Sequence, residues 1–236
     1  MFVKSVFSFN RAAQAGAARP GRRRWLAGLA IVVAGFAGAA LAPPVALAAE
    51  SAEAQLQSFV RDVRGATGRF EQTTFNPQGQ MTQQQSGEFA FARPGRFRWD
   101  VQQPFEQLIV SDGQQVVQFD PDLAQATIRP VSAAVGNAPA QVLFGDGDID
   151  AAFRLEPRPE AGDLAWLRAV PRSAEAGFAH LDIGLADGLP RRVDILDAFG
   201  QTTRIEFVTL VPGGQAPAEA FVFEPPEGVD VVRMSP

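Results

Sequence analysis

The sequence predicts a mainly β protein, with about eleven short strands in an antiparallel series that forms a strongly bent sheet or barrel. Two observations predict this fold. Short segments in which apolar and polar side chains alternate recur from residue 69 onward, and clusters of turn-forming residues separate them. Helical periodicity is limited to a few stretches. Because an antiparallel sheet usually buries one face, we expect the helices to pack on its concave side.

The N-terminus predicts a cleaved signal peptide over residues 1–48 and one mature domain over residues 49–236. Arg11, Arg19 and Arg22 to Arg24 form a basic region, Trp25 to Ala42 is apolar, and Ala46-Leu47-Ala48 is an A-x-A cleavage site. An uncleaved anchor is the alternative, because a run of about 18 apolar residues approaches the length of a membrane span. The pair Arg22-Arg23 leaves Sec and twin-arginine export both open.

Charge and cysteine content exclude several classes of protein. Removal of the leader leaves 15 basic and 26 acidic residues, a net charge of −11, which argues against nucleic acid or an anionic membrane as the primary partner. The chain has no cysteine. It therefore lacks the residue that carries the lipid of a bacterial lipoprotein, and a lipid-anchored acceptor is excluded.

The first element of the mature chain is predicted to be a helix over Ala52–Arg64, capped by Ser51 and ended by Gly65. Its apolar side chains recur at i, i+3, i+4 and i+7, at Leu56, Phe59, Val60 and Val63.

A series of strands follows this helix, and Asp112-Gly113 between two apolar runs is the strongest hairpin signal. Other turns are predicted at Asn76–Gly79, at Pro94-Gly95 and at Asp120–Asp122. The six strands of this half are predicted at Arg69–Phe75, Gly87–Arg93, Phe97–Val101, Phe105–Ser111, Gln114–Asp120 and Ala126–Arg129.

The middle of the chain changes to helical character before the strands resume. A helix is predicted to start at Gly136–Pro139 and to include Val142, Leu143 and Phe144, and a shorter one lies near Asp148–Ala152. A last helical turn is predicted at Pro217–Ala220. Five further strands are predicted at Ala165–Val170, Ala179–Leu185, Arg191–Asp197, Thr202–Leu210 and Val229–Arg233.

The segment Phe89–Val101 has the sequence FAFARPGRFRWDV, in which an arginine takes a position that strand alternation assigns to the apolar face. Strand side chains alternate between faces, so Arg93 is predicted on the same face as Phe89 and Phe91. Phe97, Trp99 and Val101 share one face of the next strand. An arginine that points into an apolar concavity indicates a specific role, although a plain edge residue before Pro94 is the alternative.

The sequence offers no constellation typical of an enzyme, a metal site or a cofactor. The lone histidine, His180, alternates with Leu181 and Ile183 in a manner typical of an ordinary strand residue. The acidic run Asp146, Asp148 and Asp150 lacks the glutamate that closes a calcium loop and is interpreted as helix capping. We therefore expect a binding protein that is not an enzyme, and we expect no cofactor or metal.

Five segments in order resemble the LolA family, the periplasmic carriers of outer-membrane lipoproteins. The similarity spans most of the mature chain but is weak over Glu156–Leu210, where only the strand pattern fits. The segments are Gly68–Gln72 (GRFEQ), Arg93–Trp99 (RPGRFRW), Ile109–Gly113 (IVSDG), Gln125–Thr127 with Gly136–Pro139 (QAT and GNAP), and Phe223–Val229 (FEPPEGV).

The resemblance implies an incomplete, half-open antiparallel barrel whose apolar cavity is closed by a helical lid. It also implies a cargo of lipoproteins, held by their acyl chains, a donor that is an inner-membrane ABC-type release complex, and an outer-membrane lipoprotein acceptor. In the family, the arginine that matches Arg93 bonds to the lid and latches it, and the phenylalanine that matches Phe97 is linked to transfer. The expected cavity lining is Phe70, Phe89, Phe91, Phe97, Trp99, Ile109, Phe119, Val142, Leu143 and Phe144.

Some alternatives stay open at this point. The aromatic residues would fill any β core, and Phe105–Ser111 has apolar residues on both faces. A sensor of lipids or lipoproteins with the same fold is the alternative function, although such regulators usually carry a second domain. A hydrolase is disfavoured because the sequence shows no nucleophile with a base. We expect a monomer in the periplasm.

Overall fold

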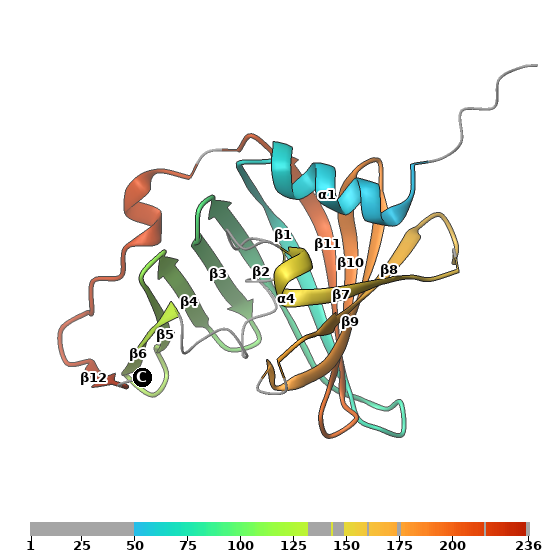
Figure 1. Ribbon diagram of the computed structural model, residues 1–236. Coiled ribbons are helices and arrows are strands. Elements are labelled where there is room, and N and C mark those ends of the chain that lie inside the picture. Colours follow the sequence, from blue (N-terminus) through green and yellow to red (C-terminus); the bar gives the residue numbers. More distant parts are fainter. Residues whose placement is uncertain are drawn as a thin grey trace, which may run out of the picture. The chain divides into compact units, whose positions relative to one another are not determined.

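The computed structural model describes residues 50–131, 143, 149–159, 161–173, 176–214 and 216–234, and Figure 1 shows its elements. The predicted signal peptide lies outside these residues, as do Gly136–Pro139 at the predicted start of the lid. Within the described part, no helix is both long and apolar enough to cross a membrane. The helices are α1 (Ala52–Asp62), α4 (Ile149–Ala152) and the 3₁₀ turn η2 (Ala218–Phe221). The strands are β1 (Gly65–Phe75), β2 (Met81–Ala92), β3 (Arg96–Gln103), β4 (Gln107–Asp112), β5 (Gln115–Asp120), β6 (Gln125–Pro130), β7 (Phe153–Pro157), β8 (Ala165–Pro171), β9 (Phe178–Ala186), β10 (Leu189–Asp197), β11 (Thr202–Pro212) and β12 (Asp230–Arg233).

Helix α1 begins as predicted, because the Ser51 side chain accepts a hydrogen bond from the Ala54 amide. Its Leu56 and Phe59 are fully buried. The predicted C-terminal end was wrong by two residues. The helix ends at Asp62 and Val63 is already extended, while Gly65 begins β1 instead of stopping the helix.

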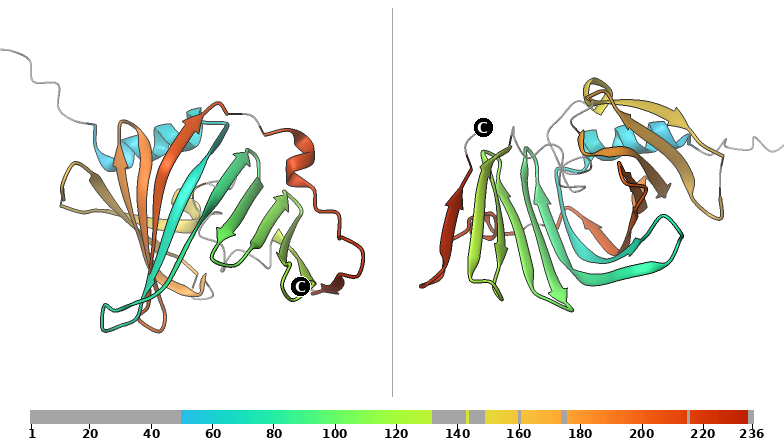
Figure 2. Two further views of the ribbon diagram at one scale, coloured as in Figure 1. Left: turned by 180° about the vertical axis from the view of Figure 1, so that it is seen from behind. Right: turned by 90° about the horizontal axis from the view of Figure 1, so that it is seen from below.

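The strands form one sheet of twelve, in the order β12-β6-β5-β4-β3-β2-β1-β11-β10-β9-β8-β7. The mainly β, antiparallel prediction is confirmed, and the sheet is not closed, because its end strands β12 and β7 do not pair with each other. Two details differ. Strand β7 was not predicted, and β12 pairs with β6 in the parallel direction. Figure 2 shows how the sheet curves from β3 through β1 and β11 to β8, with α1 on the concave side.

The concave face, called the inner face below, carries the main apolar cluster. Alternate residues of β2 and β3 contribute to it, and α1 adds Leu56 and Phe59. The strands β8–β11 supply mainly aliphatic residues, such as Leu167, Ile183 and Ile205. Strand alternation therefore places one apolar layer between α1 and the sheet, as expected for a sheet that buries one face.

The opposite, outer face of β4–β6 carries a second apolar cluster. Val110, Val117, Ala126 and Ile128 form it. The C-terminal segment packs against it on the way from η2 to β12, partly through Phe223. The inner face of the same strands is mixed: Ile109 and Val116 pack on the main cluster, whereas Gln118, Thr127 and Arg129 are polar residues on that side.

The predicted hairpins at Asn76–Gly79 and Asp112-Gly113 are present. The Asn76 carboxamide oxygen accepts hydrogen bonds from two amides of its turn, and the Asp112 carboxylate does so for Gln114 and Gln115. Gly113 has φ of +97°, a conformation that glycine adopts at low cost.

The substitution Phe70→Ala is expected to lower the free energy of unfolding by about 3–5 kcal/mol, because the Phe70 ring is fully buried in the main cluster. The control is Phe199→Ala, whose side chain is 83% exposed. The control should change the free energy by less than about 0.5 kcal/mol. Urea unfolding followed by circular dichroism measures both, and equal effects would contradict the assignment of Phe70 to the core.

Candidate functional site

Arg93 is the buried cation of the inner face and follows directly after β2. Its side chain is 8% exposed. The Nε atom donates to the Val63 carbonyl at 3.0 Å, and Nη2 donates to the Leu143 carbonyl at 2.6 Å. The guanidinium carbon also lies 5.7 Å and 5.2 Å from the ring centres of Phe59 and Phe91. Arg93 thereby joins the end of α1, the end of β2 and Leu143.

The backbone reinforces this junction. The Arg93 amide donates to the Arg64 carbonyl at 2.8 Å, so both its main chain and its side chain bind the link between α1 and β1. A buried guanidinium is costly unless its N–H groups are bonded, and hydrogen bonds from a charged donor are stronger than neutral ones. The contacts with Val63 and Leu143 help to offset that cost.

The predicted aromatic residues around Arg93 share one layer. Phe70 and Trp99 stack with ring centres 3.7 Å apart, and the ring of Phe89 lies 5.9 Å from that of Trp99 and 5.3 Å from that of Phe207. Phe91 meets Phe59 of α1 edge to face. Gly68 leaves room for this layer, because a Cβ there would lie 2.6 Å from the Phe89 ring.

Most of the predicted lining residues belong to this layer, and the structure assigns the faces of the ambiguous strand. Ile109 packs against the main cluster, whereas Leu108 and Val110 belong to the outer cluster. The residues brought together on the inner face are Phe70, Phe89, Phe91, Phe97, Trp99, Ile109 and Leu143.

Phe119 is the exception among the described residues. It lies in the outer cluster, where its ring centre is 5.2 Å from that of Phe223. The physical reason is the apolar content of β5 on both faces: Val116 points inward, so Val117 and Phe119 point outward. Val142 and Phe144 lie outside the described residues.

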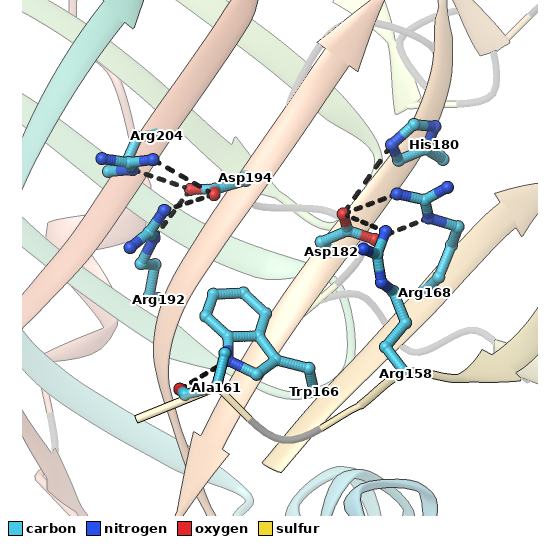
Figure 3. A network of polar contacts seen from close by, with 9 residues as sticks. All are labelled: Arg158, Ala161, Trp166, Arg168, His180, Asp182, Arg192, Asp194 and Arg204. Carbon is cyan, nitrogen blue, oxygen red and sulfur yellow. Dashed lines mark hydrogen bonds and ion pairs between the residues drawn. The ribbon is translucent and has the colours of Figure 1, made fainter. Parts of the chain in front are cut away.

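A network of arginines and aspartates, which sequence reasoning missed, lies on the outer face of β8–β11 (Figure 3). Asp182 accepts from Arg158 and Arg168, and Asp194 accepts from Arg192 and Arg204. Asp182 and Asp194 are direct cross-strand partners, a like-charge pair that is unfavourable without cations. The arginines on both sides compensate that repulsion. Alternate charged residues in these strands were the available signal, but only the strand register shows how they pair.

His180 lies at the edge of this network, with Nε2 3.8 Å from the Asp182 carboxylate. Burial lowers the pKa of His180 below 6.5, and the charge of Arg168 lowers it further, while Asp182 acts in the opposite direction. Burial alone would raise the pKa of Asp182, but the hydrogen bonds and charge of Arg168, together with the charges of Arg158 and His180, keep that pKa below its ordinary value. These contacts are those of an ordinary outer-face strand residue.

The described residues contain no group of three or more histidine, cysteine, aspartate or glutamate side chains that could hold a metal ion. Asp150 lies in α4, whereas Asp146 and Asp148 fall outside the described part. Over the described residues, the inner face offers an apolar layer that surrounds the buried guanidinium of Arg93.

Comparison with known proteins found a family model, relatives and solved structures. A model of the family described as "Outer membrane lipoprotein carrier protein LolA" matches residues 61–224. An outer-membrane lipoprotein carrier protein of Bordetella pertussis is 56% identical over 199 residues, covering 84% of this chain and 94% of the relative. The one of Dechloromonas aromatica is 38% identical and covers 79% and 89%. A solved LolA superfamily structure from Nitrosomonas europaea aligns with a TM-score of 0.47 at 11% identity, over 74% of this chain and 99% of that one.

The stability of the protein is expected to fall as the pH drops below about 6.5, because the unfolded chain then protonates His180 before the folded chain does. The contribution is present above pH 6.5 and decreases as the pH falls toward the lowered pKa of the folded state. His180→Gln should remove this dependence, since His180 is the only histidine. Urea unfolding at pH 7.5 and pH 5.5 is the measurement, and an unchanged pH difference in the variant would contradict the prediction.

Proposed function

Because the chain belongs to the LolA family of outer-membrane lipoprotein carrier proteins, we propose that it binds the acyl chains of lipoproteins on its inner aromatic layer and moves them across the periplasm. The observation that carries the proposal is the conjunction of 56% identity to a carrier with a continuous layer of buried aromatic rings. The role is transport and needs no catalysis. Residues 1–48 serve as the export signal in this proposal.

The energetics of acyl chains favour such a layer. Each methylene of a lipid chain costs about 0.8 kcal/mol of free energy when it is exposed to water. A lipoprotein without a carrier would therefore not leave its membrane on a useful timescale. A carrier must cover that surface. The rings of Phe70, Phe89 and Trp99 offer broad apolar contacts for this purpose, and Phe91 and Phe97 extend the layer along the same face.

Release requires that binding is not too tight. Non-covalent affinities saturate near about 20 kcal/mol, which is less than the gross transfer energy of several acyl chains. The hydrogen bonds of Arg93 reduce the net free energy of lipid binding. Entry of lipid between α1, β2 and Leu143 would break the hydrogen bond from Arg93 to the Leu143 carbonyl, so part of the binding free energy is spent on that bond. Arg93 acts in this way as the latch of the proposed lid.

The partners complete the proposed cycle. The protein receives lipoproteins from an inner-membrane ABC-type release complex and delivers them, as a monomer, to an outer-membrane acceptor lipoprotein. The excess of acidic residues in residues 49–236 disfavours adsorption to anionic membranes on the way.

The mature protein is expected to release lipoproteins in soluble form from inner-membrane vesicles that contain the release complex. Centrifugation followed by immunoblotting of the supernatant measures this. The carrier of Bordetella pertussis is the positive control. The carrier assignment fails if that protein extracts lipoprotein and this one does not.

Arg93→Leu is expected to accept lipoprotein within about twofold of the wild type but to transfer it about tenfold less, because a bond to a charged donor contributes about 1.5–3 kcal/mol. Arg69→Leu is the matched control, since Arg69 is exposed on β1. Transfer to acceptor-containing vesicles is the readout. Normal transfer by Arg93→Leu would remove Arg93 from the mechanism.

A further inference from the structure

One end of β2 has a strand edge that is unpaired among the described residues. Strand β3 pairs with β2 only from Ser86 to Ala92. The preceding segment, Met81–Gln85, pairs with β1 on one side, and within the described part of the chain no strand pairs with its other side. The hairpin of β1 and β2 projects beyond the end of β3 in both views (Figures 1 and 2). The main-chain groups of every second residue therefore point away from the sheet.

The β2–β3 pairing is irregular at Gly87, just before β3 ends at Gln103. The β2–β3 register shifts between Ser86 and Gly87, where a Cβ on Gly87 would lie 1.9 Å from the Asp100 carbonyl oxygen. Only a glycine permits this close approach. Beyond this point β2 continues for five residues without β3.

The Gln83–Gln85 part of the edge lacks the usual protection against strand addition, and the irregularity described in Met81–Gln85 is a register shift with β1 beside Thr82. Natural edge strands are blunted by charged residues, by proline or by bulges that turn the edge away. Met81–Gln85 has the sequence MTQQQ, with no charge and no proline, and four of its five residues are exposed. Such an edge is competent to hydrogen-bond an extended peptide.

The inner face of this hairpin continues the aromatic layer but changes to amides. Phe70 lies opposite Gly87, and the next inward pair along the two strands is Gln72 and Gln85. The Gln72 Nε2 atom donates to the Gln85 Oε1 atom at 3.1 Å. The change from apolar to polar side chains therefore occurs between two neighbouring inward pairs, over about 7 Å.

We propose that the Met81–Gln85 edge of β2 binds the N-terminal peptide of the lipoprotein cargo as an added β-strand. This inference rests on the proposed function, because the N-terminal peptide comes near the edge only when the acyl chains of the cargo are bound on the inner face. A bacterial lipoprotein carries its lipid on its N-terminal cysteine, so its polypeptide begins at the acyl chains. With those chains on Phe70, Phe89 and Trp99, a peptide of about five residues reaches the edge, at about 3.3 Å per residue.

The main-chain character of the edge suits this cargo. Strand addition binds a peptide through main-chain hydrogen bonds and depends little on its side chains. Different lipoproteins could therefore bind in the same way, while the uncharged glutamines and Thr82 neither attract nor repel a particular charge pattern. The edge would then hold the peptide while the aromatic layer holds the lipid.

Disulfide mapping tests the proposal, because the chain has no cysteine and the sulfur of a lipidated cysteine is blocked. Gln84→Cys places one thiol on the edge strand. Thr73→Cys is the matched control, since Thr73 is the direct partner of Gln84 on β1 and lies one strand further from the edge. The cargo is a lipoprotein with a single added cysteine at each of positions two to seven after the lipidated residue.

When a mild oxidant is added to accept the two thiol electrons, cargo loaded on the Gln84→Cys protein should form a disulfide at one or two of these positions, and the Thr73→Cys protein should form none. A disulfide needs Cα atoms about 4.4–6.8 Å apart, and an added strand meets this limit at Gln84 but not at Thr73. Soluble loaded cargo without a disulfide at Gln84, or with equal disulfides at both positions, overturns the proposal while the carrier function stands. A Gln84→Cys homodimer in place of the cargo adduct overturns it in favour of a second copy. If neither variant nor the wild type loads cargo, the carrier function itself fails.

A backbone readout complements the mapping and needs no substitution in the carrier. Alternate N–H groups of an extended peptide point to opposite edges. A synthetic triacylated lipopeptide can therefore lose the N–H donors of one edge by N-methylation of every second amide in its first six residues. Its affinity for the wild-type protein should be about five- to tenfold lower than that of the unmethylated lipopeptide. N-methylation of the other alternate set should have little effect, and equal affinities for all three lipopeptides would overturn the proposal.

Discussion

A buried guanidinium holds together the parts of the inner face. Arg93 donates to the carbonyl that ends α1 and to the carbonyl of Leu143, and its own amide binds Arg64. A helix, a strand end and a distant residue thus share one cation, whose burial is tolerable only while carbonyls and aromatic rings surround it. An interaction of this kind is strong when intact and costly when partly broken. In the proposed carrier role, such an interaction would keep the apolar layer covered until lipid enters.

The two faces of the sheet carry different kinds of side chain. The inner face concentrates aromatic rings, whereas the outer face of β8–β11 is covered by paired charges and that of β4–β6 by the C-terminal segment. Because side chains alternate, one set of strands serves an apolar function on one side and remains compatible with water on the other. The cover by the C-terminal segment explains why the outer face of β4–β6 is apolar.

Much of this could be predicted from the sequence, and the failures have physical reasons. Alternation and turn residues predicted eleven of the strands and placed Arg93 with Phe91. Strand β7 was missed because it has only five residues and directly follows the short helix α4, and the first half of β2 because glutamines carry little strand signal. Phe119 was assigned to the cavity because the outer cover by Phe223 depends on contacts between distant segments. The charge network likewise depends on strand register.

The central claim is that acyl chains lie on the inner aromatic layer, and the two tryptophans of residues 49–236 allow a direct measurement. Trp99 belongs to that layer, whereas Trp166 lies on the outer face beside Arg192. Lipoprotein with brominated acyl chains should quench the fluorescence of Trp99, measured in a mature Trp166→Phe variant, and leave that of Trp166, measured in a Trp99→Phe variant, unchanged. Quenching of Trp166, or of neither residue in a loaded complex, would contradict the account.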